Sequence, residues 1–366
     1  MVQSRVVMLI DFDYFFAQCE ELRNPVIKNK PVVVGVYSGR TEDSGAVSTS
    51  NYIARKYGVK SGIPLFLAKR SLEGTDAVFL PVDHKYYTQI SDNIMQILSV
   101  YASSLEQVSV DEAYLDVTVQ VSGSFENACL YAQKIKQDIK TQVGLSLTIG
   151  VGPNKLVAKI ACDSQKPDGL TIVKPEEAAN FFAILPVNRL LGVGKKTFAR
   201  MEQMGIKTIG DLAKFDIQRL VSMFGKVLGL YFHNAANAID NEPVVFTGEA
   251  ESISKINTLK QDTRDLESIL QKTSELIDII HNEVMEKGYS FKTISIYVVT
   301  VDLLSKSRSV TLEQPVKAKE IIKRHVCLLF EKYLSESSLD IRRVGVRVSG
   351  FSKEQLQQKQ LSSFFG

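Results

Sequence analysis

Apolar runs and helical periods alternate along the first half of the chain. Strands buried on both faces are predicted where the apolar run is unbroken, at residues 6–10, 31–36 and 145–151. Two more strands are predicted on either side of an acidic pair, at residues 106–110 and 113–117. Helices are predicted where apolar residues recur with a period near 3.6, at residues 14–22, 84–98 and 125–141. Another helix is expected after Asn154, which can cap it.

The pattern changes twice in the second half. Residues 175–238 look all-helical, and Asp240–Pro243 looks like a linker. Beyond the linker the order is strand, helix, two strands, helix and strand, with the six elements ending at residue 349. This βαββαβ order predicts a small α+β domain. We therefore expect an α+β multidomain protein.

Composition adds limits on the class of protein. The 366 residues suggest about two or three domains, and 45% hydrophobic with 23% charged residues is ordinary for a globular protein. A net charge of +3 means that nucleic-acid binding would have to come from local basic patches. We expect neither a signal peptide nor a membrane span, because no apolar stretch approaches about 20 residues. The four cysteines form no CxxC pair, which favours free thiols in the cytoplasm over a zinc site or disulfides: Cys19, Cys129, Cys162 and Cys327.

Three carboxylates stand at strand ends. Asp11 follows the first apolar strand, and Asp111 and Glu112 lie between two other strands. A charge at the end of a core strand is costly unless it is paired or bound to a cation, and Mg²⁺ prefers such oxygen ligands. Two metals about 4 Å apart could activate an attacking hydroxyl and stabilise a leaving pyrophosphate. The alternative is that water solvates these acids. We expect Asp13 and Asp116 to face elsewhere and to be structural.

Four segments then match the motifs of one enzyme family. Residues 11–18 (DFDYFFAQ), 49–55 (TSNYIAR), 109–116 (SVDEAYLD) and 152–159 (GPNKLVAK) occur in that order. The chain resembles the Y-family DNA polymerases over nearly its whole length, and is most similar to the DinB branch, of archaeal type. The resemblance implies a template-directed polymerase with low fidelity and lesion bypass (translesion synthesis) and without proofreading.

The resemblance also implies a right-hand architecture. The expected parts are a palm at 1–22 and 79–172, small fingers at 23–78, a helical thumb at 173–238, a linker at 239–247, a βαββαβ little finger at 248–350 and a tail at 351–366.

The motifs assign roles in the active site. By resemblance, two Mg²⁺ ions, which Mn²⁺ could replace, are held by the carboxylates of Asp11, Asp111 and Glu112 and the backbone carbonyl of Phe12. Phe16 stands at the position of the steric gate, an aromatic side chain that leaves no room for a 2′-hydroxyl. The residues expected to contact the incoming dNTP are Tyr14, Phe15, Phe16, Thr49, Tyr52, Arg55 and Lys159. Tyr52 and Arg55 share a helix face at this spacing.

Two segments are candidates for contact with primer–template DNA. The segment 191–197 resembles a helix-hairpin-helix turn, in which Gly192 and Gly194 bring backbone N–H groups to a phosphate and Lys195 and Lys196 add charge. The alternative is a plain Gly-rich turn. In the last strand, alternation puts Arg343 and Arg347 on one face and Arg342 on the other. This face resembles the DNA-binding sheet of the little finger, or is an ordinary charged solvent face.

The last residues resemble a clamp-interacting box. Gln358, Leu361, Phe364 and Phe365 fit the pattern Q-x-x-(aliphatic)-x-x-aromatic-aromatic, which favours a sliding clamp of the archaeal or eukaryotic (PCNA) type. Two aromatic residues in a polar tail favour a partner pocket over a tail folded back on its own domain. We expect a monomer apart from this partner.

Two other functions are compatible with parts of the sequence. A nucleotidyl cyclase could use paired carboxylates on a similar palm, but would need no helix-hairpin-helix turn, basic sheet or clamp tail. A catalytically silent DNA- and clamp-binding module would not need the intact carboxylates. Loss of all turnover would favour the silent module.

Overall fold

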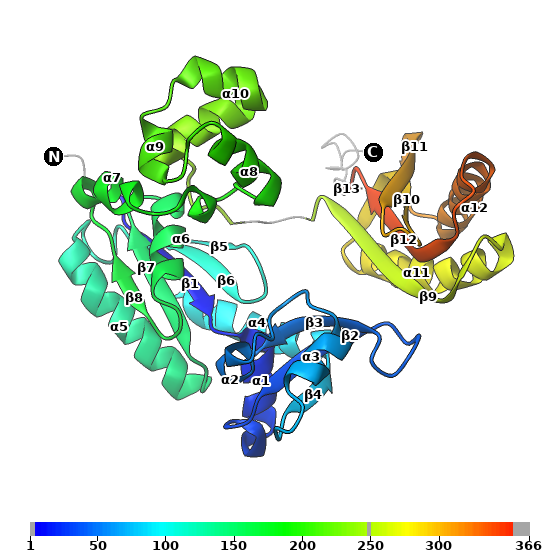
Figure 1. The fold of residues 1–366 in the computed structure, drawn as a ribbon, viewed down its shortest axis with the longest axis horizontal. Coiled ribbons are helices and arrows are strands. Elements are labelled where there is room, and N and C mark those ends of the chain that lie inside the picture. The colour runs from blue at the N-terminus through cyan, green and yellow to red at the C-terminus, as the bar shows by residue number, and fades with distance from the viewer. Residues whose placement is uncertain (1–3, 247–249, 354–366) are drawn as a thin grey trace, which may run out of the picture. The chain divides into compact units, whose positions relative to one another are not determined.

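The computed structural model describes residues 4–246 and 250–353. The chain divides into two compact units (Figure 1), which are described separately. The first unit comprises residues 1–35, 47–63 and 67–247, and the second comprises 36–46, 64–66 and 248–366.

The central sheet of the first unit is built around the strand that the sequence predicts to be most buried. Its order is β5 (Ser104–Gln107), β6 (Glu112–Asp116), β1 (Val7–Phe12), β7 (Leu147–Gly152) and β8 (Leu170–Ile172). Every residue of β1 is buried, which confirms the prediction from its unbroken apolar run. Strands β6 and β7 both pair with β1 in antiparallel register, and β8 pairs with β7 in parallel.

Helices cover both faces of this sheet, which explains why β1 does not alternate. Met8 and Ile10 pack in one core with residues of α4 (His84–Ser99) and α5 (Phe125–Gln142). Val7 and Leu9 point to the other face, where they pack with Ala158 and Cys162 of α6 (Lys155–Ser164). Helix α6 lies so close to β7 that a Cβ on Gly150 would collide with the backbone of α6.

The segment between α1 (Phe15–Arg23) and α4 forms a small sheet with two short helices. The strand order is β3 (Gly45–Ser50), β2 (Val32–Tyr37) and β4 (Val78–Pro81), beside α2 (Tyr52–Lys56) and α3 (Leu65–Ser71). The apolar run at 31–36 predicted β2. No clear pattern of apolar residues predicted β3, α3, β4 or the three-residue strand β8.

Residues 175–238 are helical, as predicted. The helices are α7 (Pro175–Ala183), the 3₁₀ turn η2 (Val187–Arg189), α8 (Lys195–Gln203), α9 (Ile209–Ala213) and α10 (Ile217–Ala236). Their core, which includes Phe182, Met201 and Phe232, also contains Val157 and Ala161 of α6.

Residues 239–246, the described part of the predicted linker, form neither helix nor strand. They are nevertheless held against the central sheet. Val244 is buried beside Val7 and Leu9, and its carbonyl accepts a hydrogen bond from Ser104 Oγ at 2.8 Å. Nearby, the buried Lys155 and Glu106 form an ion pair at 3.1 Å, and Glu106 Oε2 accepts a hydrogen bond from the N–H of Val245 at 3.1 Å.

The second unit contains the predicted βαββαβ order. Its sheet has the order β11 (Ser305–Val316), β10 (Tyr289–Thr300), β12 (Ile341–Ser349) and β9 (Ser252–Thr263). Helices α11 (Leu266–Glu286) and α12 (Lys319–Glu336) pack with it in one core, into which β12 directs Val344, Val346 and Val348. The short β13 (Ser352–Lys353) pairs with the start of β10.

All four cysteines are free thiols, and Cys19 and Cys162 are buried. Within residues 4–246 and 250–353, no helix is both long and apolar enough to cross a membrane.

Candidate active site

The sheet register brings the predicted carboxylates together. Asp11 pairs with Glu112 across β1 and β6, and the N–H of Phe12 donates to the carbonyl of Asp111 at 2.9 Å. Strand β5 ends at Gln107, earlier than predicted, so Asp111 lies in the turn before β6. Ser109 Oγ donates to the carboxylate of Asp111 at 2.5 Å and fixes that turn. The acids predicted from two strand ends therefore meet where β1 ends and β6 begins, on two inner strands of the sheet.

Two lysines lie among these acids. The ammonium of Lys159, on α6, is 2.7 Å from Glu112 Oε2 and 3.4 Å from Asp11 Oδ2. Lys166, just after α6, places its ammonium 2.5 Å from Asp11 Oδ2. Asp163 Oδ1 forms ion pairs with both ammonium groups, 3.6 Å from that of Lys159 and 3.4 Å from that of Lys166. The site is therefore a network of alternating charges.

Burial and the charges of this network shift the pKa values of its members. Burial raises the pKa of the Asp111 carboxyl, and the hydrogen bond from Ser109 opposes this shift. Burial also raises the pKa of Glu112, although the hydrogen bond and the positive charge of Lys159 act to lower it. For Lys159 burial acts to lower the pKa, but the hydrogen bond and charge of Glu112 outweigh it and the pKa is raised. Lys159 is therefore charged at neutral pH.

The donor set fits a hard divalent cation. Asp11, Asp111 and Glu112 supply carboxylate oxygens, which Mg²⁺ prefers. One oxygen each of Asp11 and Asp163 and the sulfur of Cys162 lie within 4.8 Å of one another. Burial raises the pKa of the Cys162 thiol, which donates to the carbonyl of Thr148, so the oxygens are the better ligands. The acidic cluster is thus suited to oxygen-preferring metals.

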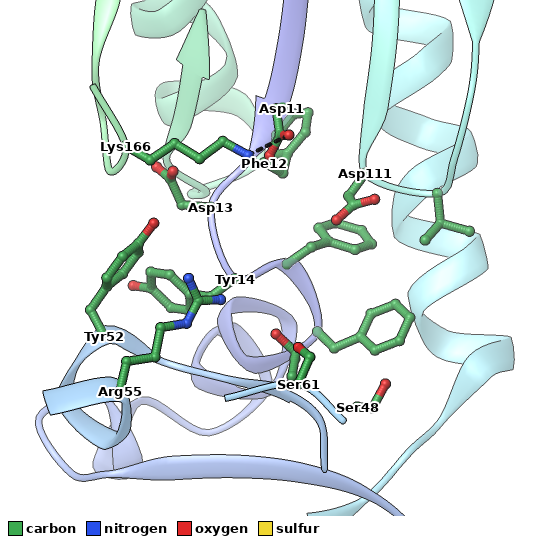
Figure 2. Close-up of a pocket in the computed structure, with 14 residues that line it drawn as sticks. Asp11, Phe12, Asp13, Tyr14, Ser48, Tyr52, Arg55, Ser61, Asp111 and Lys166 are labelled. Carbon is green, nitrogen blue, oxygen red and sulfur yellow. Dashed lines mark ion pairs between the residues drawn. The ribbon is translucent and has the colours of Figure 1, made fainter. Parts of the chain in front are cut away.

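A pocket of about 290 Å³ opens beside the carboxylates. Figure 2 shows Asp11, Asp111 and Lys166 on one side of it and Tyr52 and Arg55 on the opposite side. Six of the predicted nucleotide contacts line the pocket: Tyr14, Phe15, Phe16, Thr49, Tyr52 and Arg55. Lys159 is not among the lining residues, whereas Lys166 is.

Helix α2 presents an aromatic ring and a cation to the pocket, as their spacing predicted. Asn51 caps the helix through its side chain, which accepts from the N–H of Ala54. The guanidinium of Arg55 lies over the ring of Tyr52, 4.6 Å from its centroid, and Arg55 Nε donates to the carbonyl of Ser50 at 2.9 Å. The rings of Tyr52 and Tyr14 pack edge to face, with their centroids 5.3 Å apart. These contacts fix both side chains toward the pocket.

Phe16 is held between two helices. Its ring stacks on Tyr87 of α4 with the centroids 4.3 Å apart and the planes 21° apart. Tyr87 is itself buried, and its hydroxyl donates to Glu20 at 2.7 Å. A backed aromatic ring at the pocket wall is the arrangement that a steric gate requires.

The expectation that Asp13 faces away from the site is wrong, because Asp13 lines the same pocket. Strand β1 ends at Phe12 and Tyr14 has a φ of 35°, so strand alternation does not extend to Asp13. Its buried carboxylate accepts hydrogen bonds from Thr148 Oγ1 at 2.9 Å, Ser146 Oγ at 3.2 Å and the N–H of Asp168 at 2.9 Å. Asp116 lies outside the pocket and pairs with Arg5 at 3.8 Å.

Comparison with known proteins decides the family. The chain is 45% identical to DNA polymerase IV of Nitrosopumilus maritimus over 365 residues, covering all of both chains. The chain belongs to the Y family of DNA polymerases. It is also 41% identical to DNA polymerase IV of Methanosarcina acetivorans, covering 97% of this chain and 98% of the relative. A further relative is DNA polymerase IV of Saccharolobus solfataricus, at 37% identity over 98% of this chain and 99% of the relative.

Sequence models of three family segments match this Y-family polymerase. The impB/mucB/samB family matches residues 10–163, its C-terminal domain matches 250–362, and the DNA polymerase-iota thumb domain matches 188–240. A solved chimera of the Y-family polymerases Dbh and Dpo4 is similar, with a TM-score of 0.90, 35% identity and coverage of 95% and 99%. An insertion ternary complex of Dbh DNA polymerase has a TM-score of 0.69 at 35% identity, with coverage of 94% and 98%.

These likenesses confirm three predictions: a DinB-type polymerase of archaeal character, the multidomain right-hand fold, and translesion DNA polymerase activity. They do not favour a nucleotidyl cyclase or a silent module.

The helix-hairpin-helix candidate of the polymerase has the expected backbone. Gly192 has a φ of 81°, a region that residues with a Cβ rarely adopt, and Gly194 is the N-cap of α8. Lys195 and Lys196 open the helix and are exposed. Gly194 and the two lysines are therefore exposed at the start of α8, and no side chain caps the helix there.

The three arginines of β12 are in different environments. Arg343 is exposed, whereas Arg347 donates to the hydroxyl of Tyr297 at 3.0 Å. Arg342 lies at a register irregularity between β12 and β9, and its guanidinium is 3.7 Å from Asp262. Arg343 is thus the most exposed of the three arginines. The clamp-box residues Gln358, Leu361, Phe364 and Phe365 lie outside the described residues.

Sequence reasoning missed Lys166, together with Ser48 and Ser61, as lining residues of the pocket. Lys166 follows the helix of the fourth motif almost directly, so its position next to that block was the available signal. The two serines gave no signal: Ser48 lies in β3, which has little apolar periodicity, and Ser61 lies in a turn, where short polar residues are common.

Proposed function

We propose that the polymerase extends a primer by two-metal phosphoryl transfer, with Asp11, Asp111, Glu112 and the carbonyl of Phe12 holding two Mg²⁺ ions. The observation that carries this proposal is the meeting of the three carboxylates where β1 ends and β6 begins, with Asp11 and Asp111 lining a pocket that also contains Arg55 and Lys166. Bound Mg²⁺ would lower the pKa of the primer hydroxyl and neutralise charge on the leaving pyrophosphate. Mn²⁺ also suits oxygen ligands and could replace it.

The incoming dNTP would lie in this pocket, with its triphosphate between the cations. Arg55 offers a planar set of donors to phosphate oxygens and Lys166 a point charge. Tyr14, Thr49 and Tyr52 would add hydrogen bonds. Lys159 remains a proposed contact because its ammonium lies beside Asp11, and it also orients Glu112. The chain would thus bind and align the triphosphate before the reaction.

Phe16 would exclude ribonucleotides. Its ring lines the pocket beside Phe15 and is backed by Tyr87, so it cannot retreat to admit a 2′-hydroxyl. The same pocket would therefore select dNTP over rNTP by steric exclusion.

Contacts with primer–template DNA would come from both units. The exposed first turn of α8, with Gly192, Gly194, Lys195 and Lys196, suits sequence-independent phosphate binding. On β12, Arg343 would contact the DNA backbone, with Arg342 and Arg347 in support.

The proposed parts of the polymerase are the palm (1–22 and 79–172), the fingers (23–78), the thumb (173–238) and the little finger (248–350). A small fingers sheet of three short strands would check the nascent pair loosely, which supports low fidelity and lesion bypass.

We further propose that the tail binds a PCNA-type sliding clamp through Gln358, Leu361, Phe364 and Phe365. We also propose that the polymerase is otherwise a monomer and that it is located in the cytoplasm. The support is the sequence of the tail and the four free thiols.

The test of the proposed function is primer extension with Mg²⁺ and dNTPs, on an undamaged template and on one with an abasic site. We expect templated extension on both, with a pause at the lesion. Extension that stops at every abasic site would contradict the translesion role. Primer–template binding without any extension would contradict the assignment of the catalytic carboxylates.

A further inference from the structure

The turn that carries Lys166 is short and sits between two anchored elements. It begins after α6 ends at Ser164 and finishes where β8 begins at Leu170. Lys166 is the residue of this turn that lines the nucleotide pocket, and its ammonium pairs with Asp11 (Figure 2). The side chain has four rotatable bonds, so its reach is fixed only as well as the turn that holds its backbone.

Asp13 holds this turn from the pocket side. Its carboxylate accepts the N–H of Asp168 at 2.9 Å. Thr148, which donates its hydroxyl to Asp13, accepts the next N–H of the turn, that of Gly169, at 3.3 Å. Asp13 is only 1% exposed, so these bonds are shielded from water. Both N–H groups at the end of the turn are therefore fixed through Asp13 and its partner.

Lys136 holds the same two residues from the opposite side. Its ammonium, on α5, donates to the carbonyls of Asp168 at 2.6 Å and Gly169 at 3.0 Å, and to that of Leu147 on β7 at 2.9 Å. It also pairs with the carboxylate of Asp168 at 2.8 Å. An ammonium has three protons, and here all of them are directed at the turn and the adjoining strand.

We propose that Asp13 and Lys136 are positioning residues for nucleotide binding: together they fix the turn 165–169 and so hold the ammonium of Lys166 over the triphosphate. This inference rests on the proposed function, in which Lys166 contacts the nucleotide. Neither Asp13 nor Lys136 needs to touch the nucleotide itself. Misplacement of a binding group by about 1 Å can cost on the order of 100-fold, so a loosened turn is enough to weaken the contact.

The test is single-nucleotide insertion over a range of dNTP concentration by four variants of the full chain: Lys166→Ala, Asp13→Asn, Lys136→Met and the double variant Asp13→Asn/Lys166→Ala. We expect Lys166→Ala to raise KM for dNTP by roughly 30-fold, and Asp13→Asn and Lys136→Met by about 10-fold each, with kcat changed less than KM. Because Asp13 acts through Lys166, the double variant should be no worse than Lys166→Ala alone.

A second readout separates positioning from loss of fold. Inhibition by pyrophosphate should weaken in Asp13→Asn and Lys136→Met in proportion to the rise in KM, while the Kd for primer–template stays within about 2-fold. Matched controls are Asp116→Asn, an acid of the same sheet that faces Arg5, and Lys140→Met, one helical turn beyond Lys136 and exposed. Both controls should leave KM unchanged.

The outcomes distinguish the two claims. If Lys166→Ala leaves KM and pyrophosphate inhibition unchanged, Lys166 is not a triphosphate contact and that part of the proposed function fails. If Lys166→Ala raises KM but Asp13→Asn and Lys136→Met do not, or if the effects of Asp13→Asn and Lys166→Ala multiply in the double variant, the positioning role is wrong.

Discussion

Asp11 and Glu112 lie opposite each other in the register of β1 and β6, and one ammonium, that of Lys159, pairs with both carboxylates. Two facing acids on adjacent strands repel each other, so their proximity requires a cation. Lys159 supplies that charge, and α6 can bring it so close because Gly150 leaves room for the helix on the sheet. The architecture of the palm is therefore built around a concentration of negative charge.

Replacing the proposed steric gate should change sugar selection. Phe16→Ala removes the ring that stacks on Tyr87 and opens space at the pocket wall. We expect use of rNTP relative to dNTP to rise on the order of 100-fold, measured as the ratio of kcat/KM values for the two nucleotides. Phe16→Tyr retains the ring and should preserve selection. An unchanged ratio in Phe16→Ala would exclude Phe16 as the gate.

The two lysines at the start of α8 should affect DNA affinity and its salt dependence. Lys195→Gln with Lys196→Gln removes two exposed charges next to Gly194. We expect the slope of log K against log salt for primer–template binding to become shallower by about 2, with no dependence on DNA sequence. The control pair Lys134→Gln with Lys140→Gln on exposed positions of α5 should leave the slope unchanged. Equal slopes in both pairs would favour a plain Gly-rich turn.

Sequence reasoning succeeded where periodicity and chemistry agree. The unbroken apolar run of β1 predicted both its position and its burial on two faces, and the three carboxylates expected at strand ends lie close together in the structure. The βαββαβ order of the second unit followed from periodicity in the same way.

The failures have a common physical origin. Strand β3 was missed because its sequence, GAVSTS, has little apolar periodicity and is stabilised by pairing with β2. Asp13 was misjudged because the strand ends one residue earlier. Lys166 was missed, although it lies close to the fourth motif, because only the folded turn directs its ammonium to Asp11. Long-range contacts decided each of these positions.

The tail should act only when a clamp is present. Deletion of residues 358–366, or Phe364→Ala with Phe365→Ala, should leave extension of short primers unchanged and abolish stimulation by a PCNA-type clamp. The measurement is product length per binding event with and without the clamp, because tethering raises the effective concentration of the polymerase at the primer. Stimulation that persists in both variants would place the clamp contact elsewhere in the chain.

The buried ion pair beside the linker should matter for stability. Lys155→Met leaves the carboxylate of Glu106 buried without its cation, next to the N–H of Val245. We expect a loss of about 3 kcal/mol in the free energy of unfolding of the first unit, measured by denaturant unfolding. Lys155→Met combined with Glu106→Leu should recover much of this loss. A double variant less stable than the single one would contradict the pairing argument.

The most direct test of the central claim is single-turnover insertion by the wild type and by Asp111→Asn, over a range of Mg²⁺ concentration, with primer–template affinity measured in parallel. Asp111→Asn keeps the size of the side chain and can still pair with Ser109, but removes a negative charge at the proposed metal site. We predict a loss of at least roughly 1000-fold in the insertion rate, with a Kd for DNA within about 2-fold of the wild type, because the proposed DNA contacts lie elsewhere. Insertion at the wild-type rate, with the wild-type dependence on Mg²⁺, would contradict the assignment of Asp111 as a metal ligand.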